Sequence, residues 1–287
     1  MLTGLSVGLV GCVDDSISSN SSSSSSSSNP STIINTSSDD WDAGDGWTLE
    51  WSDEFNGSSI DSSIWTHETG YGNNGWGNDE WQYYTSDEEN SSVANGYLTI
   101  TAMSDETAGK RNGSVTSARM VTLDNNIDFK YGKVAAKIKV PTGQGIWPAF
   151  WMLGTNINSV GWPNCGEIDI MEKVGGTDEK EQTVHGTIHY SDADGAYDYD
   201  GDGVELNEYL SYDYHVYEIE WSESAIIWKI DGEQYHSVDI SNSQYDEFKE
   251  DFFIILNVAV GGNWPGSPDS TTIFPQEMSV DWVRVYK

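Results

Sequence analysis

The heptapeptide Gly166-Glu167-Ile168-Asp169-Ile170-Met171-Glu172 places three carboxylates among apolar, strand-forming residues. Side chains of a β-strand alternate between its two faces, so Glu167 and Asp169 share one face and Glu172 should point the other way. A bulge that adds one residue at Ile170-Met171 would rotate Glu172 back onto the same surface. Crowded carboxylates disfavour one another's ionisation, which favours a functional interpretation. Acidic and apolar residues also alternate in any half-solvated strand of an acidic protein. The heptapeptide alone therefore does not distinguish an active site from an ordinary surface strand.

The segments on either side of the heptapeptide favour an active site. In Gly145–Leu153, the residues Trp147, Ala149 and Trp151 share one face of a predicted strand, and in Val184–His189 the two histidines share another. Two indoles and a histidine would then flank the acids. A pair of carboxyl groups with separated pKa values, one a nucleophile and one a proton donor, is what cleavage of a glycosidic bond requires.

The rest of the chain reads as short strands separated by turns rich in Gly, Asn and Asp. Apolar residues alternate in Gly132–Pro141, in Tyr217–Trp221 and in Val280–Tyr286. The run Phe252–Val258 predicts a strand buried on both faces, and Gln244–Glu250 is the best candidate for a helix. Many strands in one block of about 245 residues predict an all-β fold with two packed sheets.

The N-terminal residues predict a surface-anchored protein. Residues 1–12 resemble part of a signal sequence, and Leu9–Cys12 resembles a lipobox, in which the cysteine is lipidated; the alternative is a frayed N-terminus. Residues 13–40 are rich in Ser and Asn and predict a disordered linker. Residues 41–287 form the folded domain, in which Cys165 is the one thiol and no disulfide is expected. A secreted or cell-surface location follows from this plan.

The composition restricts the partners. The chain has 13 Lys and Arg against 47 Asp and Glu, a formal charge of −34. Such a surface repels nucleic acid and anionic lipid, and it is poorly suited to a sulfated polymer. Aromatic residues make up 12% of the chain, enough to supply both the core and a sugar-binding surface. A neutral polysaccharide and a monomeric protein are expected.

The sequence resembles glycoside hydrolase family 16, in particular its laminarinase-like endo-β-1,3-glucanases. The resemblance covers nearly all of residues 45–287 and rests on motifs in matching order: Trp51–Phe55, Gly75–Thr85, Gly145–Leu153, Gly166–Glu172, Gly186–His189, Gly261–Gly266 and Phe274–Met278. It implies a jelly-roll sandwich of two antiparallel sheets with a concave substrate cleft.

The resemblance also implies roles for individual residues. Glu167 matches the nucleophile, Asp169 its assisting carboxylate and Glu172 the acid/base, with no catalytic cofactor. The inserted Met171 is similar to the laminarinase-type bulge, which lichenase-type members lack. The positions that match substrate-binding residues are Trp147, Trp151, His189, Arg119 and Trp264.

The sequence offers two candidate calcium sites. Family members carry a structural calcium, and the matching positions are Glu54, the backbone of Gly96 and Asp281; the alternative is three ordinary surface residues. Separately, Asp198–Gly203 begins like an EF-hand loop, but Tyr209 stands where the closing Glu belongs. An unconventional calcium site or a plain acidic loop remains open there.

The sequence therefore predicts a secreted, retaining endo-β-1,3-glucanase. A mixed-linkage β-1,3-1,4-glucanase or another family 16 hydrolase is the alternative within the enzymes. A non-catalytic β-glucan-binding module is the alternative outside them, although such modules usually lose one of the three acids, and all three are present here.

Overall fold

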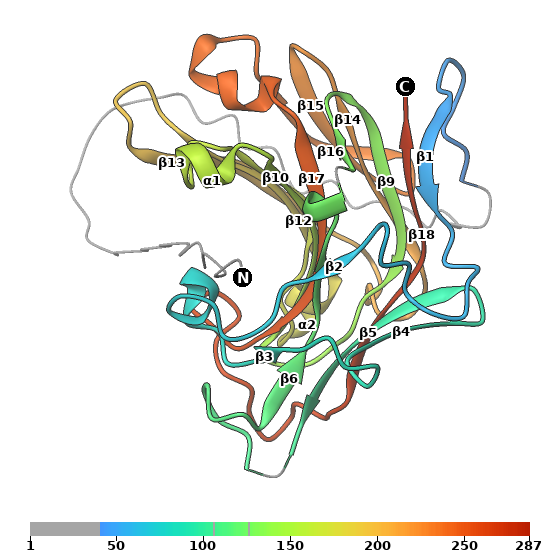
Figure 1. The fold of residues 1–287 in the computed structure, drawn as a ribbon, viewed down its shortest axis with the longest axis vertical. Coiled ribbons are helices and arrows are strands. Elements are labelled where there is room, and N and C mark those ends of the chain that lie inside the picture. Colours follow the sequence, from blue (N-terminus) through green and yellow to red (C-terminus); the bar gives the residue numbers. More distant parts are fainter. Residues whose placement is uncertain (1–40, 106, 126) are drawn as a thin grey trace.

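The computed structural model describes residues 41–287 with the exception of residues 106 and 126. The predicted signal segment, Cys12 and the linker to residue 40 therefore lie outside the described residues. In the described part the strands form two sheets, one of eight and one of ten strands, packed face to face (Figure 1). Neighbouring strands are antiparallel except β3 and β6. The predicted all-β jelly-roll sandwich is confirmed.

The eight-stranded sheet carries the acid motif on its central strands. Its order is β13 (Tyr197–Glu205), β12 (Thr183–Ser191), β11 (Glu167–Glu172), β10 (Ile146–Gly154), β17 (Phe252–Val260), β7 (Arg119–Val121) and β2 (Thr66–His67), with β8 (Asp128–Phe129) also on β17.

The ten-stranded sheet forms the other layer, on the right in Figure 1. Its order is β16 (Glu233–Asp239), β15 (Ala225–Ile230), β14 (His215–Trp221), β9 (Gly132–Lys139), β18 (Gln276–Tyr286), β5 (Tyr97–Ser104), β6 (Val115–Ser117) and β3 (Tyr83–Tyr84), with β1 (Leu49–Asp53) on β18 and β4 (Ser91–Ala94) on β5.

The helical segments of the described chain are short. They are α1 (Ile157–Val160), α2 (Asp178–Gln182), a π-helical turn at Gly75–Asp79 and 3₁₀ turns at Leu123–Asn125 and Ser243–Lys249. The last of these lies where the sequence predicts a helix. No helix among the described residues has the length and apolar character needed to cross a membrane.

The main core fills the space between the sheets. Alternate residues of β10 and β17 enter it, such as Phe150, Met152 and Leu256, and meet Ile138, Ile219 and Trp228 from the other sheet. The opposite faces of β10 and β17 are buried as well, beneath the residues of the cleft. β17 is therefore buried along its whole length, which includes the predicted run Phe252–Val258. This double burial makes the central strands a rigid support for the acids.

One predicted loop is a strand. Asp198–Gly203 lies within β13, which pairs with β12 along its full length and forms one edge of the eight-stranded sheet. The interpretation of this segment as an acidic loop is therefore wrong. Alternating Asp with Tyr and Gly provides the period of two that a strand requires.

Candidate active site

The bulge predicted in β11 is present. On β10, Phe150 pairs with Met171 and Trp151 with Asp169, so the extra residue is Ile170 and not the predicted Met171. The β12 ladder has its irregularity between Asp169 and Glu172 as well. Both Ile170 and Met171 point into the main core. The bulge thereby returns Glu172 to the face that already carries Glu167 and Asp169.

The three carboxylates line one cleft on the eight-stranded sheet. The wall of the cleft comes from strands β7, β10, β11 and β17 and from the turn at residues 75–80. Its lining residues are Trp76, Asn78, Glu80, Arg119, Trp147, Ala149, Trp151, Glu167, Asp169, Glu172, Asn257 and Ala259. The shared face predicted for Trp147, Ala149 and Trp151 is thus the face of the acids.

Each of the two outer acids accepts a hydrogen bond from an indole. Trp162 Nε1 donates to Glu167 Oε2 at 2.9 Å, and Trp147 Nε1 donates to Glu172 Oε1 at 2.9 Å. Because Glu167 and Glu172 are 6% and 9% exposed, these bonds hold the carboxyl groups in fixed positions along the cleft.

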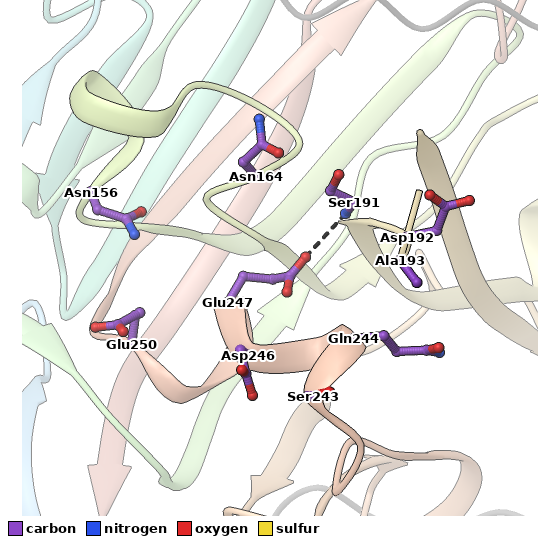
Figure 2. A pocket seen from close by; sticks show the side chains of 10 residues that line it. All are labelled: Asn156, Asn164, Ser191, Asp192, Ala193, Ser243, Gln244, Asp246, Glu247 and Glu250. Carbon is purple, nitrogen blue, oxygen red and sulfur yellow. Dashed lines mark hydrogen bonds between the residues drawn. The ribbon is translucent and has the colours of Figure 1, made fainter. Parts of the chain in front are cut away.

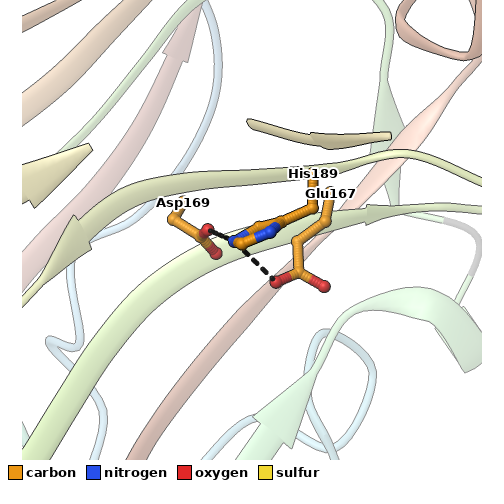
Figure 3. A group of neighbouring side chains, drawn as sticks. All are labelled: Glu167, Asp169 and His189. Atoms are coloured by element: carbon orange, nitrogen blue, oxygen red, sulfur yellow. Dashed lines mark ion pairs between the residues drawn. The ribbon is translucent and has the colours of Figure 1, made fainter. Parts of the chain in front are cut away.

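His189 lies against Asp169 and Glu167. Its Nε2 is 3.1 Å from Asp169 Oδ2 and 3.8 Å from Glu167 Oε1 (Figure 3). Its Nδ1 is 2.9 Å from the hydroxyl of Tyr197 on the next strand. Among the described residues, Glu167, Asp169 and His189 are also the group whose ligand atoms, all within 4.8 Å, could share a metal ion.

Burial controls the protonation of the acids. It raises the pKa of Glu167, Asp169 and Glu172 to about 8, and the neighbouring charge of Asp169 adds to the shift at the two glutamates. The free energy of holding three negative charges together is high, so the group retains protons at neutral pH. One carboxyl group can then serve as an acid while another is ionised.

Arg119 lies between two indoles on the β7 side of the cleft. Its guanidinium carbon is 4.7 Å from the ring centres of both Trp76 and Trp151. Its Nε donates to Glu68 Oε2 at 2.5 Å. The indole of Trp151 is also fixed, since its Nε1 donates to Asn257 Oδ1 at 2.7 Å. The structure therefore brings Arg119 and Trp151 together in the cleft.

Trp264 is placed differently from the other predicted binding residues. It is 42% exposed, and its ring lies edge-on to Trp147 and to His185, with centroids 5.4 Å and 5.1 Å apart. It thus lies at the rim of the cleft, on the side of Glu172.

A fourth carboxyl group of the cleft was not predicted. Glu80 is buried, and burial raises its pKa to about 7, although a hydrogen bond from Gln82 opposes the shift. Glu80 belongs to the motif Gly75–Thr85, which contributes to the resemblance, but the sequence alone does not place it in the cleft. Asn257, Trp162 and Tyr197 were also missed; Trp162 stands only five residues before Glu167, which is the one signal that the sequence offers.

The residues predicted for calcium lie away from the cleft, near β1 and β18. Asp53 pairs with Val283, which places Glu54 and Asp281 at the same end of that ladder. A Cβ on Gly96 would lie 4.0 Å from Asn56 Oδ1, so Gly96 borders the same turn. Arg284 donates to both carboxylate oxygens of Glu54 at 2.8 Å. Asp281 Oδ2 in turn lies 3.4 Å from Lys137 Nζ, so both predicted acids have a cationic partner.

A second, open depression lies beside the end of β12 (Figure 2). Glu247 accepts a hydrogen bond from the backbone N–H of Ser191 at 3.0 Å there. The residues that line this depression are Asn156, Asn164, Ser191, Asp192, Ala193, Ser243, Gln244, Asp246, Glu247 and Glu250. None of the predicted catalytic or binding residues belongs to it.

Comparison with known proteins agrees with this geometry. The family model described as "Glycosyl hydrolases family 16" matches residues 78–284. The chain is 43% identical to the clotting factor G alpha subunit of Tachypleus tridentatus and 39% identical to glucan endo-1,3-beta-glucosidase A1 of Niallia circulans. Each match covers 84% of this chain, which spans only 34% and 38% of those relatives.

A solved structure matches over nearly its whole length. The laminarinase catalytic domain of Thermotoga maritima is 44% identical to this chain, with a TM-score of 0.75. The match covers 84% of this chain and 98% of that domain.

Proposed function

The chain belongs to glycosyl hydrolase family 16, and on this premise we propose that it is a retaining endo-β-1,3-glucanase of neutral, laminarin-like glucans. The observation that carries the proposal is the bulge that presents Glu167, Asp169 and Glu172 on one face of a cleft. The names of the matched glucan endo-1,3-beta-glucosidase and laminarinase domain support the β-1,3 linkage. The scarcity of cationic side chains supports a neutral polymer.

The first half of the reaction forms a glycosyl-enzyme. Ionised Glu167 attacks the anomeric carbon, and its bond to carbon forms as the bond to the leaving oxygen breaks. Protonated Glu172 gives its proton to that oxygen. Burial raises the pKa of both Glu167 and Glu172 to about 8, which allows one of the pair to hold a proton at neutral pH, and the role of each follows from its match to the family.

The second half releases the sugar with the original configuration. Ionised Glu172 takes a proton from water, and the hydroxide oxygen displaces Glu167 from the anomeric carbon. Two inversions at one carbon give retention, and this chemistry requires carboxyl groups about 5–5.5 Å apart.

Asp169 and His189 position and tune this pair. Asp169 stands between the two glutamates along β11, and its charge raises the pKa of both. His189 contacts Asp169 and Glu167 from β12 and holds their orientation. We assign substrate contacts to Trp147, Trp151 and Arg119 in the cleft and to Trp264 at its rim. Indole faces and a guanidinium group suit the apolar faces and hydroxyl groups of glucose.

Reducing-end release from laminarin, lichenan, agarose and carrageenan tests the function. We expect oligosaccharides from laminarin, with at least about 100-fold losses of kcat in Glu167→Gln and Glu172→Gln. Asp169→Asn should lose less, because Asp169 forms no bond to the sugar. Equal losses in Asp169→Asn and Glu167→Gln would contradict these roles.

The same assay separates the alternatives. Faster cleavage of lichenan than of laminarin would identify a mixed-linkage glucanase instead. Binding of laminarin without cleavage of any of the four polymers would identify a glucan-recognition module and refute catalysis.

We propose that the protein acts outside the cell, with a lipid on Cys12 and a linker to the domain, as a monomer. The lipobox-like Leu9–Cys12 and the Ser/Asn-rich residues 13–40 support this proposal. Labelled palmitate should be incorporated into the full chain in a bacterial host and not into Cys12→Ser; equal labelling of both would refute the anchor.

A further inference from the structure

Strand β13 contains the acidic segment Asp198–Gly203, which has no role in the proposed reaction. Its register with β12 pairs Tyr197 with Ser191, Tyr199 with His189, Gly201 with Thr187 and Gly203 with His185. Directly paired residues of antiparallel strands share a face of the sheet. Tyr197 and Tyr199 therefore stand on the face of His189, which is the face of the acids.

The other face of β13 carries the aspartates. Asp198 accepts a hydrogen bond from the hydroxyl of Tyr190 at 3.2 Å, and Asp200 lies 3.6 Å from His236 of β16. The alternation thus sorts the motif into an acidic face, turned away from the cleft, and a neutral face of two tyrosines and two glycines.

The two glycines keep the cleft face of β13 flat. A Cβ on Gly201 would lie 2.6 Å from Thr187 Oγ1, and a Cβ on Gly203 would lie 2.9 Å from His185 Nδ1. Side chains at these positions would collide with β12. The aromatic rings at 197 and 199 therefore project from β13 beside a low floor.

The rings of Tyr197 and Tyr199 are exposed to solvent, which is unusual for large aromatic side chains. Tyr197 is 41% and Tyr199 61% exposed, and their planes lie within 21° with centroids 6.3 Å apart. Tyr197 also lies 5.0 Å from the ring of Trp162, and Tyr199 lies 6.0 Å from the ring of His189. These contacts continue a row of rings outward from the indole that holds Glu167.

The sheet order places this row beyond the catalytic strand. β13 is two strands from β11, which is about 10 Å, and it lies on the opposite side of β11 from the strands of Asn257 and Arg119. A glucan that crosses the strands over the acids would reach Tyr197 and Tyr199 on leaving the central cleft. Figure 1 shows β13 as the last strand of its sheet.

We propose that Tyr197 and Tyr199 form an outer binding subsite that stacks on glucosyl units of a β-1,3-glucan beyond those contacted by the acids. Flat, amphipathic rings suit the apolar faces of a neutral pyranose, and the aspartates behind them disfavour an anionic ligand. The substrate class rests on the proposed function, whereas the location rests on strand register and exposure.

Binding to a non-cleaving enzyme tests the subsite separately from catalysis. In a Glu167→Gln background, calorimetry with laminarioligosaccharides of increasing length should show affinity rising with length. Adding Tyr199→Ala should weaken binding of the longest oligosaccharides by about threefold to tenfold, with a smaller effect as the chain shortens. Tyr199→Phe should restore the affinity, because it keeps the ring.

Tyr97→Ala is the matched control. Tyr97 is also an exposed tyrosine stacked on another, Tyr214, at 5.6 Å, but it belongs to β5 of the other sheet. The Tyr97→Ala variant of the Glu167→Gln protein should bind every oligosaccharide with the same affinity as the Glu167→Gln protein. Equal weakening at all lengths, no weakening in Tyr199→Ala, or the same weakening in Tyr97→Ala would overturn the subsite. Length-dependent binding in a protein that cleaves no glucan would support the subsite and refute the proposed reaction.

Discussion

At the scale of single residues, the active site is a set of buried carboxyl groups whose charged forms are poorly solvated. Glu167, Asp169 and Glu172 are almost fully buried, and burial raises the pKa of each. Two indole N–H groups and His189 compensate for only part of the lost hydration. The reactivity of the site therefore carries a cost in folding stability.

This cost depends on pH. A carboxyl group with a pKa near 4.5 in the unfolded chain and about 8 in the folded chain makes the folded state bind more protons between these values. The free energy of unfolding should then fall as pH rises through this window. Glu172→Gln removes the group, so its Tm should exceed that of the parent by about 2–4 °C at pH 8 and by less at pH 4.5. Thermal unfolding at both pH values measures this.

Glu181→Gln provides a buried control of opposite sign. Burial tends to raise the pKa of Glu181, but Lys173 outweighs it and leaves that pKa lowered. Loss of this carboxylate should lower the Tm at pH 8. A gain in both variants, or in neither, would show that the acids of the cleft are not a source of instability.

At the scale of elements, the bulge of β11 is supported from the opposite sheet. Trp228 of β15 crosses the core, and its Nε1 donates to the backbone carbonyl of Asp169 at 2.7 Å. Gly186 of β12 leaves room for this indole, since a Cβ there would lie 2.3 Å from Trp228 Cδ1. The bulged backbone thus gains a partner that a regular ladder would have supplied.

Replacing that indole should affect the chemistry as well as the fold. Trp228→Phe leaves the Asp169 carbonyl without its donor, which costs about 1–3 kcal/mol, and frees the bulge to shift, so kcat on laminarin should fall. Trp221→Phe is the control, because Trp221 Nε1 also donates to a backbone carbonyl in the core, that of Phe248 at 3.1 Å. A similar loss of stability with unchanged kcat is expected for it. Equal kcat losses in both variants would mean that Trp228 acts only through the core.

Local patterns predicted β11 well and β13 poorly. The parity of the three acids along seven residues is enough to require a bulge, and the bulge is present. Gly and Asp have low strand propensity, so Asp198–Gly203 read as a loop; its pairing with β12 outweighs that preference. Trp162 and Tyr197 were missed because their contacts with Glu167 and His189 exist only once separate segments have folded together.

At the scale of the whole molecule, the cleft and the predicted calcium site belong to different sheets. The acids lie on β11 of the eight-stranded sheet, whereas Glu54 and Asp281 lie beside β1 and on β18 of the other. A ligand at the second site can therefore act on global stability without touching the reacting atoms.

Chelation tests this separation. If calcium binds at Glu54, the backbone of Gly96 and Asp281, EDTA should lower the Tm by several degrees, since a ligand bound only to the folded state stabilises it. At temperatures well below unfolding, kcat should stay unchanged. Asp281→Asn should have a lower Tm with calcium and little further response to EDTA. An unchanged Tm of the calcium-loaded parent after EDTA would refute the site.

The edge position of β13 has one more consequence, for the behaviour of many copies in solution. An edge strand offers unpaired backbone groups to which a strand of another molecule can add, the first step of aggregation. Asp198, Asp200 and Asp202 place three like charges along this edge within five residues. Two such edges repel each other when they approach, so the aspartates of β13 oppose edge-to-edge association between molecules.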